Sequence, residues 1–170
     1  SFFMNDTLVF ATTQQLDLEI WGEQAFALKG QSFGHIQVID NVTVSPASLR
    51  EHWEQGLNPS LWKPWGSPLP VIVPGGGCYG SDALDVNGDG TWLSGVSSYQ
   101  VFDLAMQPNL DFRVRTNGST PGDLVEVGWS SETALSYSGD DEQPEMIASL
   151  SVDPSTDQVT FRVLDETLSM

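Results

Sequence analysis

The sequence predicts an all-β chain folded as a β-sandwich or jelly roll. Apolar and charged residues alternate with a period of two, most clearly where Leu110, Phe112 and Val114 are separated by charged side chains. Turn residues interrupt such segments about every eight to twelve positions, as in sandwich and barrel proteins. Hydrophobic residues make up 39% of the 170 positions, which is enough to build a core.

The strands follow from this alternation. They are predicted at Phe2–Met4, Leu8–Ala11, Ile36–Val44, Leu110–Val114, Val125–Trp129, Met146–Val152 and Val159–Leu164. Asn5 and Asp6 lie between the first two strands, as a hairpin turn would. Residues 153–157 join the last two, because Pro154 fixes one φ and the short acids bond neighbouring amides.

One short helix is predicted to interrupt the strands. Ser48 and Glu51 have the spacing of a capping box, and Gly56 supplies a left-handed stop. Leu49 and Trp53, four residues apart, would share the buried side of this helix.

A proline-rich segment follows the predicted helix, and its prolines force an extended path. Exposing Trp53, Trp62 and Trp65 together would be costly. The segment is therefore predicted to pack against the core rather than to act as a linker.

The charge balance excludes several classes of protein. Six Lys and Arg against 23 Asp and Glu give a net charge of -17, so no basic face is available for nucleic acid or for an anionic membrane surface. No apolar run is long enough for membrane insertion.

Cys78 alone forms no intrachain disulfide, and His35 and His52 lack zinc-site spacing. The acidic, lysine-poor surface suits an extracellular, secreted protein.

Several segments resemble bacterial extracellular concanavalin-A-like, or laminin-G-like, jelly-roll domains. Segments similar to the opening strands of that family are Gly66–Pro70, Ala83–Gly90, Ser94–Ser98 and Leu110–Arg115. Phe2–Phe10 resembles the family's late hairpin, and Gly30–Gly34 with Ile39–Val44 resembles its closing strand. The resemblance implies a jelly roll whose closing strands come first in the chain.

The resemblance divides the chain into closing strands at residues 1–46, a helix and Pro/Trp-rich segment at residues 47–70, and opening strands at residues 71–170. These parts form one structural domain or two half-domains. The inverted order fits a circular permutation, a fragment of two tandem copies, or a subunit completed by a neighbour's strands. The family's strand after Val159–Leu164 is expected to be missing, which would leave an open edge for pairing with another chain. In an exchanged assembly Phe2, Met4, Leu8 and Phe10 would pack against the neighbour.

A calcium site is the first candidate for function. Asp85, Asn87 and Asp89 alternate, with Gly90 at the sixth position, like the first half of a calcium loop. The twelfth position is Val96 rather than Glu, so a further ligand such as Asp82 is needed. The alternative is a polar β-turn in which Asn-Gly and Asp-Gly supply positive φ.

Tryptophans are the second candidate, because their flat faces pack against sugar rings. Most are predicted to lie in the core, as Trp129 does in step with Val125 and Val127. Trp92, following the acidic turn, is expected to reach a ligand, and Trp62 and Trp65 are further candidates.

Hydrolysis is the third candidate, since the resemblance includes laminarinase-type glucanases with three alternating acids on one strand. Asp17, Glu19 and Glu23 share one strand face, but differ from that motif in identity and spacing. The expected function is therefore a non-catalytic extracellular module that binds a glycan or cell-surface polymer, or supports adhesion, with calcium as a candidate cofactor. The alternatives are a filament subunit joined by strand exchange and, third, a glycoside hydrolase.

Overall fold

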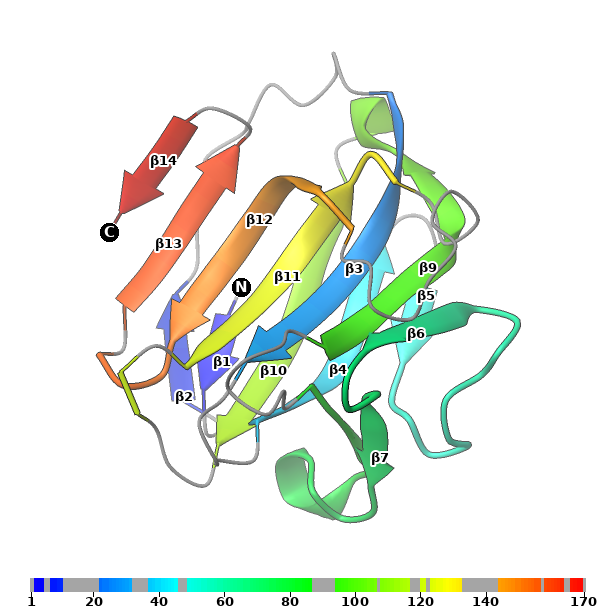
Figure 1. Cartoon of the computed structure of the whole chain (residues 1–170), viewed down its shortest axis with the longest axis vertical. Coiled ribbons are helices and arrows are strands. Elements are labelled where there is room, and N and C mark those ends of the chain that lie inside the picture. The colour runs from blue at the N-terminus through cyan, green and yellow to red at the C-terminus, as the bar shows by residue number, and fades with distance from the viewer. Residues whose placement is uncertain are drawn as a thin grey trace.

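The fold of the chain is a sandwich of two mainly antiparallel sheets (Figure 1). The computed structural model describes residues 2–4, 7–10, 22–31, 37–45, 49–86, 94–106, 108–116, 120–121, 123–132, 144–156, 158–163 and 166–169. The predicted β-sandwich is thereby confirmed.

Sheet A lies behind sheet B in Figure 1. Its strands, in spatial order, are β2 (Thr7–Phe10), β1 (Phe2–Met4), β10 (Asn109–Thr116), β4 (Gln37–Ser45), β8 (Ala83–Asp85) and β7 (Val71–Val73), with β5 (Leu49–Glu51) paired to β4. Sheet B contains β14 (Glu166–Ser169), β13 (Gln158–Val163), β12 (Met146–Asp153), β11 (Leu124–Ser130), β3 (Glu23–Gln31), β9 (Ser94–Asp103) and β6 (Trp62–Gly66). Two short 3-10 turns, η2 (Cys78–Gly80) and η3 (Leu104–Met106), complete the described elements.

The early strands lie inside both sheets. β3 lies between β11 and β9, and β4 lies between β10 and β8. Strands from residues 1–46 and from residues 71–170 therefore pair with each other within one chain.

Alternating apolar residues of both sheets form the core. Phe112 and Val114 of β10, and Val125, Val127 and Trp129 of β11, are buried in one cluster. This alternation places Arg113 and Arg115 on the outer face of sheet A. Phe26 of β3 packs in the same core, with its ring centroid 5.2 Å from that of Trp129 and 6.4 Å from that of Trp62.

The predicted helix near residue 50 is wrong. Leu49–Glu51 is strand β5, which pairs with β4. Glu51 does not cap a helix; its carboxylate accepts hydrogen bonds from the backbone amides of His52 and Trp53 and from Nε1 of Trp62. Trp53 has a φ of 60°, which a helix does not allow. Burial of the tryptophans and pairing with the central strand override the local capping pattern.

The strand expected to be missing at the end of the chain is present. β14 pairs antiparallel with β13, from Val163 opposite Glu166 to Thr160 opposite Ser169. The expectation of a missing strand is therefore wrong. It depended on the family's strand count, and the last residues of the chain show too little alternation for the sequence to predict β14.

The predicted turn after β12 is confirmed. The carboxylate of Asp153 accepts hydrogen bonds from the backbone amide of Ser155, at 2.8 Å, and from its hydroxyl, at 2.6 Å. Partial burial raises the pKa of Asp153, but hydrogen bonds from Ser155 and Thr156 together outweigh this effect and hold the pKa below its ordinary value.

Asp153→Asn is expected to reduce the free energy of unfolding at neutral pH, since a carboxylate with a lowered pKa stabilises the fold in its charged form. The contribution is present above the unfolded-state pKa, about 3.8, and is lost as the pH falls through the lower folded-state value. Urea unfolding of both proteins between pH 7 and pH 2 measures the difference. A difference that stays constant over this range would contradict the assignment.

Candidate functional site

The structure places Trp62 and Trp65 in the interior. Their exposed fractions are 1% and 0%, and Trp53 is also buried. The prediction of a packed segment is confirmed, whereas the interpretation of Trp62 and Trp65 as ligand-stacking residues is wrong. Nε1 of Trp65 donates to Oγ of Ser97 at 3.2 Å, and the ring lies against Gly95, where a Cβ would come within 2.7 Å of it. Trp92 lies outside the described residues.

The proposed calcium ligands are only partly described. Asp85 ends β8 and Asp82 precedes this strand, so about three residues of extended chain, ~10 Å, separate their Cα atoms. The carboxylate of Asp82 accepts a hydrogen bond from the amide of Gly75 at 3.0 Å. Asn87 and Asp89 lie outside the described residues. Within the described part of the chain no three His, Cys, Asp or Glu side chains group as a metal site.

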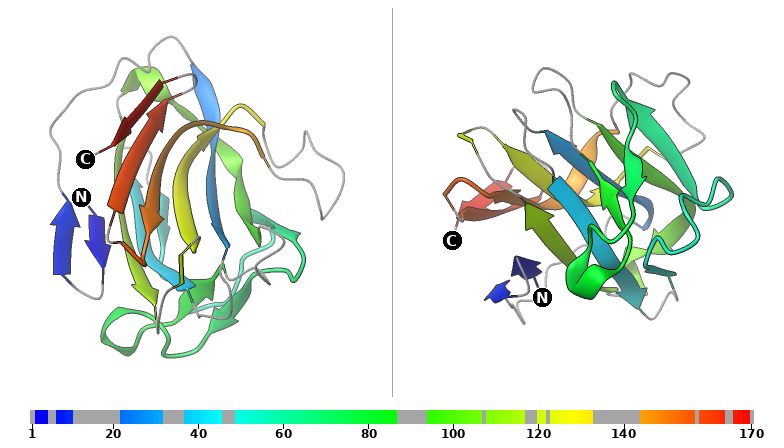
Figure 2. Two further views of the ribbon diagram at one scale, coloured as in Figure 1. Left: turned by 60° about the vertical axis from the view of Figure 1, so that its left-hand side comes forward. Right: turned by 90° about the horizontal axis from the view of Figure 1, so that it is seen from below.

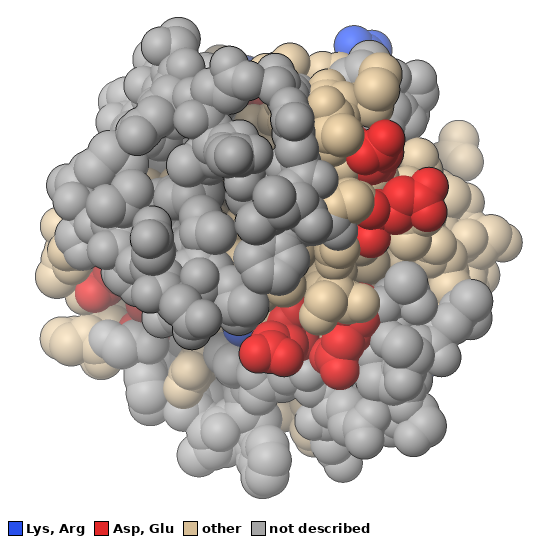
Figure 3. Space-filling model, turned by 90° about the horizontal axis from the view of Figure 1, so that it is seen from above, with Lys and Arg blue, Asp and Glu red and all other residues tan. Residues whose placement is uncertain are grey.

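The acids considered for hydrolysis are likewise mostly outside the described residues. Asp17 and Glu19 are among these, whereas Glu23 begins β3 in an exposed position opposite Asp103 of β9. Like charges directly opposite each other destabilise a strand pair. Acidic side chains also dominate the charged part of the surface visible in Figure 3.

The residues proposed for assembly lie on β1 and β2. Phe2 and Met4 belong to β1, and Leu8 and Phe10 to β2, which pairs with it antiparallel. β1 runs parallel to β10 of the same chain, with Phe2 opposite Phe112 and Met4 opposite Val114.

The most exposed large apolar side chain in the described regions is Tyr79, at 84%. Tyr79 lies in a connection between β7 and β8, residues 74–82, which we call the Tyr79 loop. Its φ of 57° and ψ of 22° place it in the left-handed region, which costs a bulky residue about 1–3 kcal/mol. Such strain persists only where surrounding contacts fix the backbone.

A buried carboxylate fixes the base of the Tyr79 loop. Asp40 of β4 is 1% exposed, and its Oδ2 accepts hydrogen bonds from the amide of Cys78, at 3.2 Å, and from the hydroxyl of Ser81. A Cβ at Gly77 would lie 2.6 Å from the same oxygen, so only glycine allows this approach. The loop therefore lies against the outer face of sheet A, near the lower end of the view in Figure 1.

Two arginines of β10 hold the loop from the same face. Nη1 of Arg115 donates to the carbonyl oxygen of Gly77 at 3.0 Å. The guanidinium carbon of Arg113 lies over the Tyr79 ring, 5.4 Å from its centroid, within the range of a cation–π contact. Burial lowers the pKa of Arg113, but its interactions with Cys78 and Tyr79 outweigh this and raise it overall. Arg113 thus covers one face of an otherwise exposed ring.

A β-bulge lies beside this anchor. Arg113 pairs with Asp40 and Asp111 with Thr43, so Asn41 and Val42 together face Phe112. Asn41 has a φ of 52°, and its Nδ2 donates to Asp40 at 2.8 Å. Its Oδ1 is then the acceptor of the 2.8 Å contact with Nδ1 of His52, which assigns the ring proton to Nδ1. The described non-glycine residues with positive φ are Asn41, which follows Asp40, Trp53, which follows His52, and Tyr79 in the loop itself.

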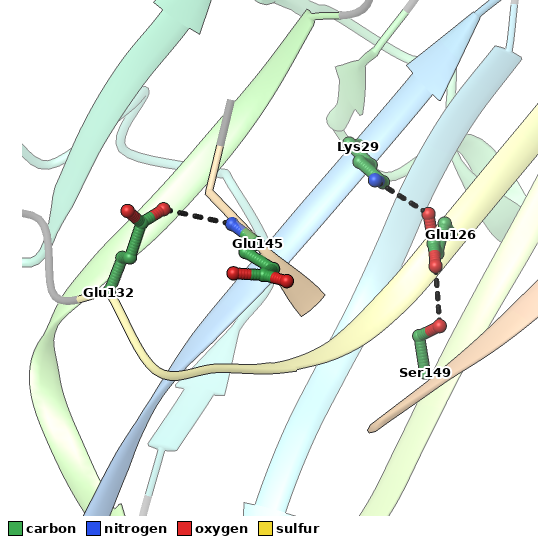
Figure 4. A network of polar contacts seen from close by, with 5 residues as sticks. All are labelled: Lys29, Glu126, Glu132, Glu145 and Ser149. Carbon is green, nitrogen blue, oxygen red and sulfur yellow. Dashed lines mark hydrogen bonds and ion pairs between the residues drawn. The ribbon is translucent and has the colours of Figure 1, made fainter. Parts of the chain in front are cut away.

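A second polar network lies on the outer face of sheet B (Figure 4). Nζ of Lys29 lies 2.8 Å from Oε2 of Glu126, and Oε1 of Glu126 accepts a hydrogen bond from the hydroxyl of Ser149. The two charged side chains are only 12% and 4% exposed. In the same view the backbone amide of Glu145 donates to the carboxylate of Glu132 at 2.9 Å. The ion pair is part of a satisfied network, which is typical of a structural role.

No protein-family model, no curated protein and no solved structure matches this chain. Among the described residues no helix is long and apolar enough to cross a membrane.

Sequence reasoning missed Tyr79 as a site residue. A lone tyrosine flanked by Cys78 and Gly80 carries no periodic signal. The available signal was an aromatic residue in a glycine-rich turn, which a tight connection tends to place on the surface.

Proposed function

We propose that the chain is a non-catalytic, extracellular β-sandwich module that binds a glycan through the Tyr79 loop. The observation that carries this proposal is an aromatic ring held in a strained conformation, backed on one face by Arg113 and 84% exposed. Resemblance to concanavalin-A-like jelly rolls agrees with such a role but does not supply it, because a fold hosts many functions.

The geometry suits a sugar ring better than a buried small molecule. A sugar presents a face of C–H groups that packs against an aromatic ring, while its hydroxyls remain hydrated. Anchoring of the loop by Asp40, Arg113 and Arg115 orders the tyrosine before binding, so less conformational entropy is lost when the ligand binds.

Tyr79→Ala is expected to weaken glycan binding about tenfold, because losing one stacking contact removes about 1.4 kcal/mol. Tyr79→Phe keeps the ring and should bind within about twofold of the wild type, a free-energy difference of ~0.4 kcal/mol. Titration calorimetry with soluble oligosaccharides, after screening on a glycan array, measures both. Tyr99→Ala on β9 is a matched control, since Tyr99 is also an exposed tyrosine, at 37%. Equal affinities for Tyr79→Ala and the wild type would contradict the proposal.

Calcium assistance is a separate element of the proposal. Asp85 is the first position of the candidate loop that also includes Asn87 and Asp89, and carboxylate oxygens are the ligands that calcium prefers. The strongly acidic composition supports the extracellular location.

The second candidate function is assembly by strand exchange. The observation that favours it is the short connection of the β1–β2 hairpin to the sheet, three residue pairs in a parallel ladder with β10. A hairpin held by so few pairs is suited to exchange with an identical copy. Exchange requires oligomers that increase with concentration on a sizing column, whereas a binding module remains a monomer.

A further inference from the structure

We infer that the glycan bound at Tyr79 carries no net charge. This inference rests on the proposed function and specifies the ligand class of the same site. The charged side chains around the ring disfavour both a cationic and an anionic sugar on its open face.

A cationic amino sugar is disfavoured on the open face of Tyr79. Arg113 already lies over the other face, 5.4 Å from the centroid. A second cation at a similar height would lie ~10 Å from Arg113 and would be repelled by it. An exposed cation–π contact is weak, so this repulsion offsets a substantial part of the attraction to the ring.

An anionic sugar is disfavoured by the surrounding carboxylates. Asp82 lies in the Tyr79 loop, and Glu54 accepts a hydrogen bond from the amide of Asp82 at 3.1 Å. Asp40 lies beneath the loop and Asp111 lies on the same face of β10 as the arginines. Four acids and two arginines therefore lie in or beside the Tyr79 loop. Both arginines already contact the loop, so the local net charge is negative and repels an anion. The net charge of -17 adds a long-range repulsion.

A neutral sugar meets neither penalty. Its stacking on the ring depends on dispersion and on the apolar C–H face, which salt does not screen. Binding that depends on Tyr79 is therefore expected to be insensitive to ionic strength. Asp82, Glu54 and the acidic surface as a whole will also attract a cationic polymer, but that attraction should fall with salt and should not require Tyr79.

The test compares oligosaccharides that differ in charge. Oligomers of N-acetylglucosamine are neutral, and their deacetylated forms have the same backbone with protonated amines. Neutral β-1,4-glucan, β-1,3-glucan and mannan oligomers extend the neutral set, and oligogalacturonate is the anionic probe. Affinities of the full chain, Tyr79→Ala and Tyr79→Phe are measured by calorimetry in 0.05 M and 0.5 M NaCl.

The expected result is that at least one neutral oligomer binds the wild type and Tyr79→Phe, with Kd changing less than about twofold between the two salt concentrations. Tyr79→Ala should weaken this binding about tenfold. Stronger Tyr79-dependent binding of the deacetylated oligomer or of oligogalacturonate would overturn the inference and leave glycan binding at Tyr79 intact. Failure of every oligosaccharide to bind in a Tyr79-dependent way would overturn the proposed function as well.

Discussion

Lys29→Met is expected to destabilise the protein by about 3–5 kcal/mol, the usual effect of removing one partner from a buried ion pair. Lys29 is 12% exposed and its ammonium lies 2.8 Å from the carboxylate of Glu126, which is itself 4% exposed. Without Lys29, Glu126 retains the hydroxyl of Ser149 but loses its cationic partner. A carboxylate in such a place must remain charged without compensation or take up a proton, and either change costs free energy.

The matched variants separate loss of the pair from loss of charge. Replacing both residues, Lys29→Met with Glu126→Leu, should recover most of the stability, since an apolar pair of similar size carries no desolvation penalty. Arg50→Met is the control, because Arg50 is exposed on β5 and its replacement should change the free energy of unfolding by about 0.5 kcal/mol or less. Urea denaturation measures all four proteins. If the double variant is no more stable than Lys29→Met, the pair is not the source of the effect.

The sandwich was predictable from the sequence because the alternation is strong where one strand face is buried and the other is wet. β10 illustrates this: Phe112 and Val114 are buried, whereas Asp111 and Arg115 are exposed. Central strands with small residues on the outer face were harder to predict. β3 contains Ala25, Phe26, Ala27 and Leu28, all fully buried, so no polar alternation marks it.

The features of the candidate site were less predictable, because they depend on contacts between distant parts of the chain. Asp40 and Ser81 are 41 positions apart, and Lys29 and Glu126 are nearly a hundred apart, so neither pairing has a local signature. The capping pattern at Ser48 and Glu51 had a local signature, yet Glu51 binds Trp62 instead. Local patterns predicted the layers of this fold, but tertiary contacts decide which polar residues organise the surface.

Asp40→Asn is expected to destabilise the protein by about 2–4 kcal/mol and to weaken Tyr79-dependent binding at the same time. All four described contacts of the carboxylate come from donors: the amide and Nδ2 of Asn41, the amide of Cys78 and the hydroxyl of Ser81. An asparagine presents one oxygen and one NH2 group, so at least one donor would face another donor. Buried donors without an acceptor cost the full desolvation of the group.

Binding should respond because Asp40 holds the backbone that keeps Tyr79 in its left-handed conformation. Asp111→Asn is the matched control, as it removes one exposed carboxylate from the neighbouring strand and should leave stability within about 0.5 kcal/mol.

Gly77→Ala tests the same anchor by a different route, since its Cβ would lie 2.6 Å from Oδ2 of Asp40. In an Asp40→Ala background that oxygen is absent, so the cost of Gly77→Ala should fall, giving a coupling energy of about 0.5–3 kcal/mol in a double-mutant cycle. Purely additive effects, or full Tyr79-dependent binding in a folded Asp40→Asn protein, would contradict the role assigned to Asp40.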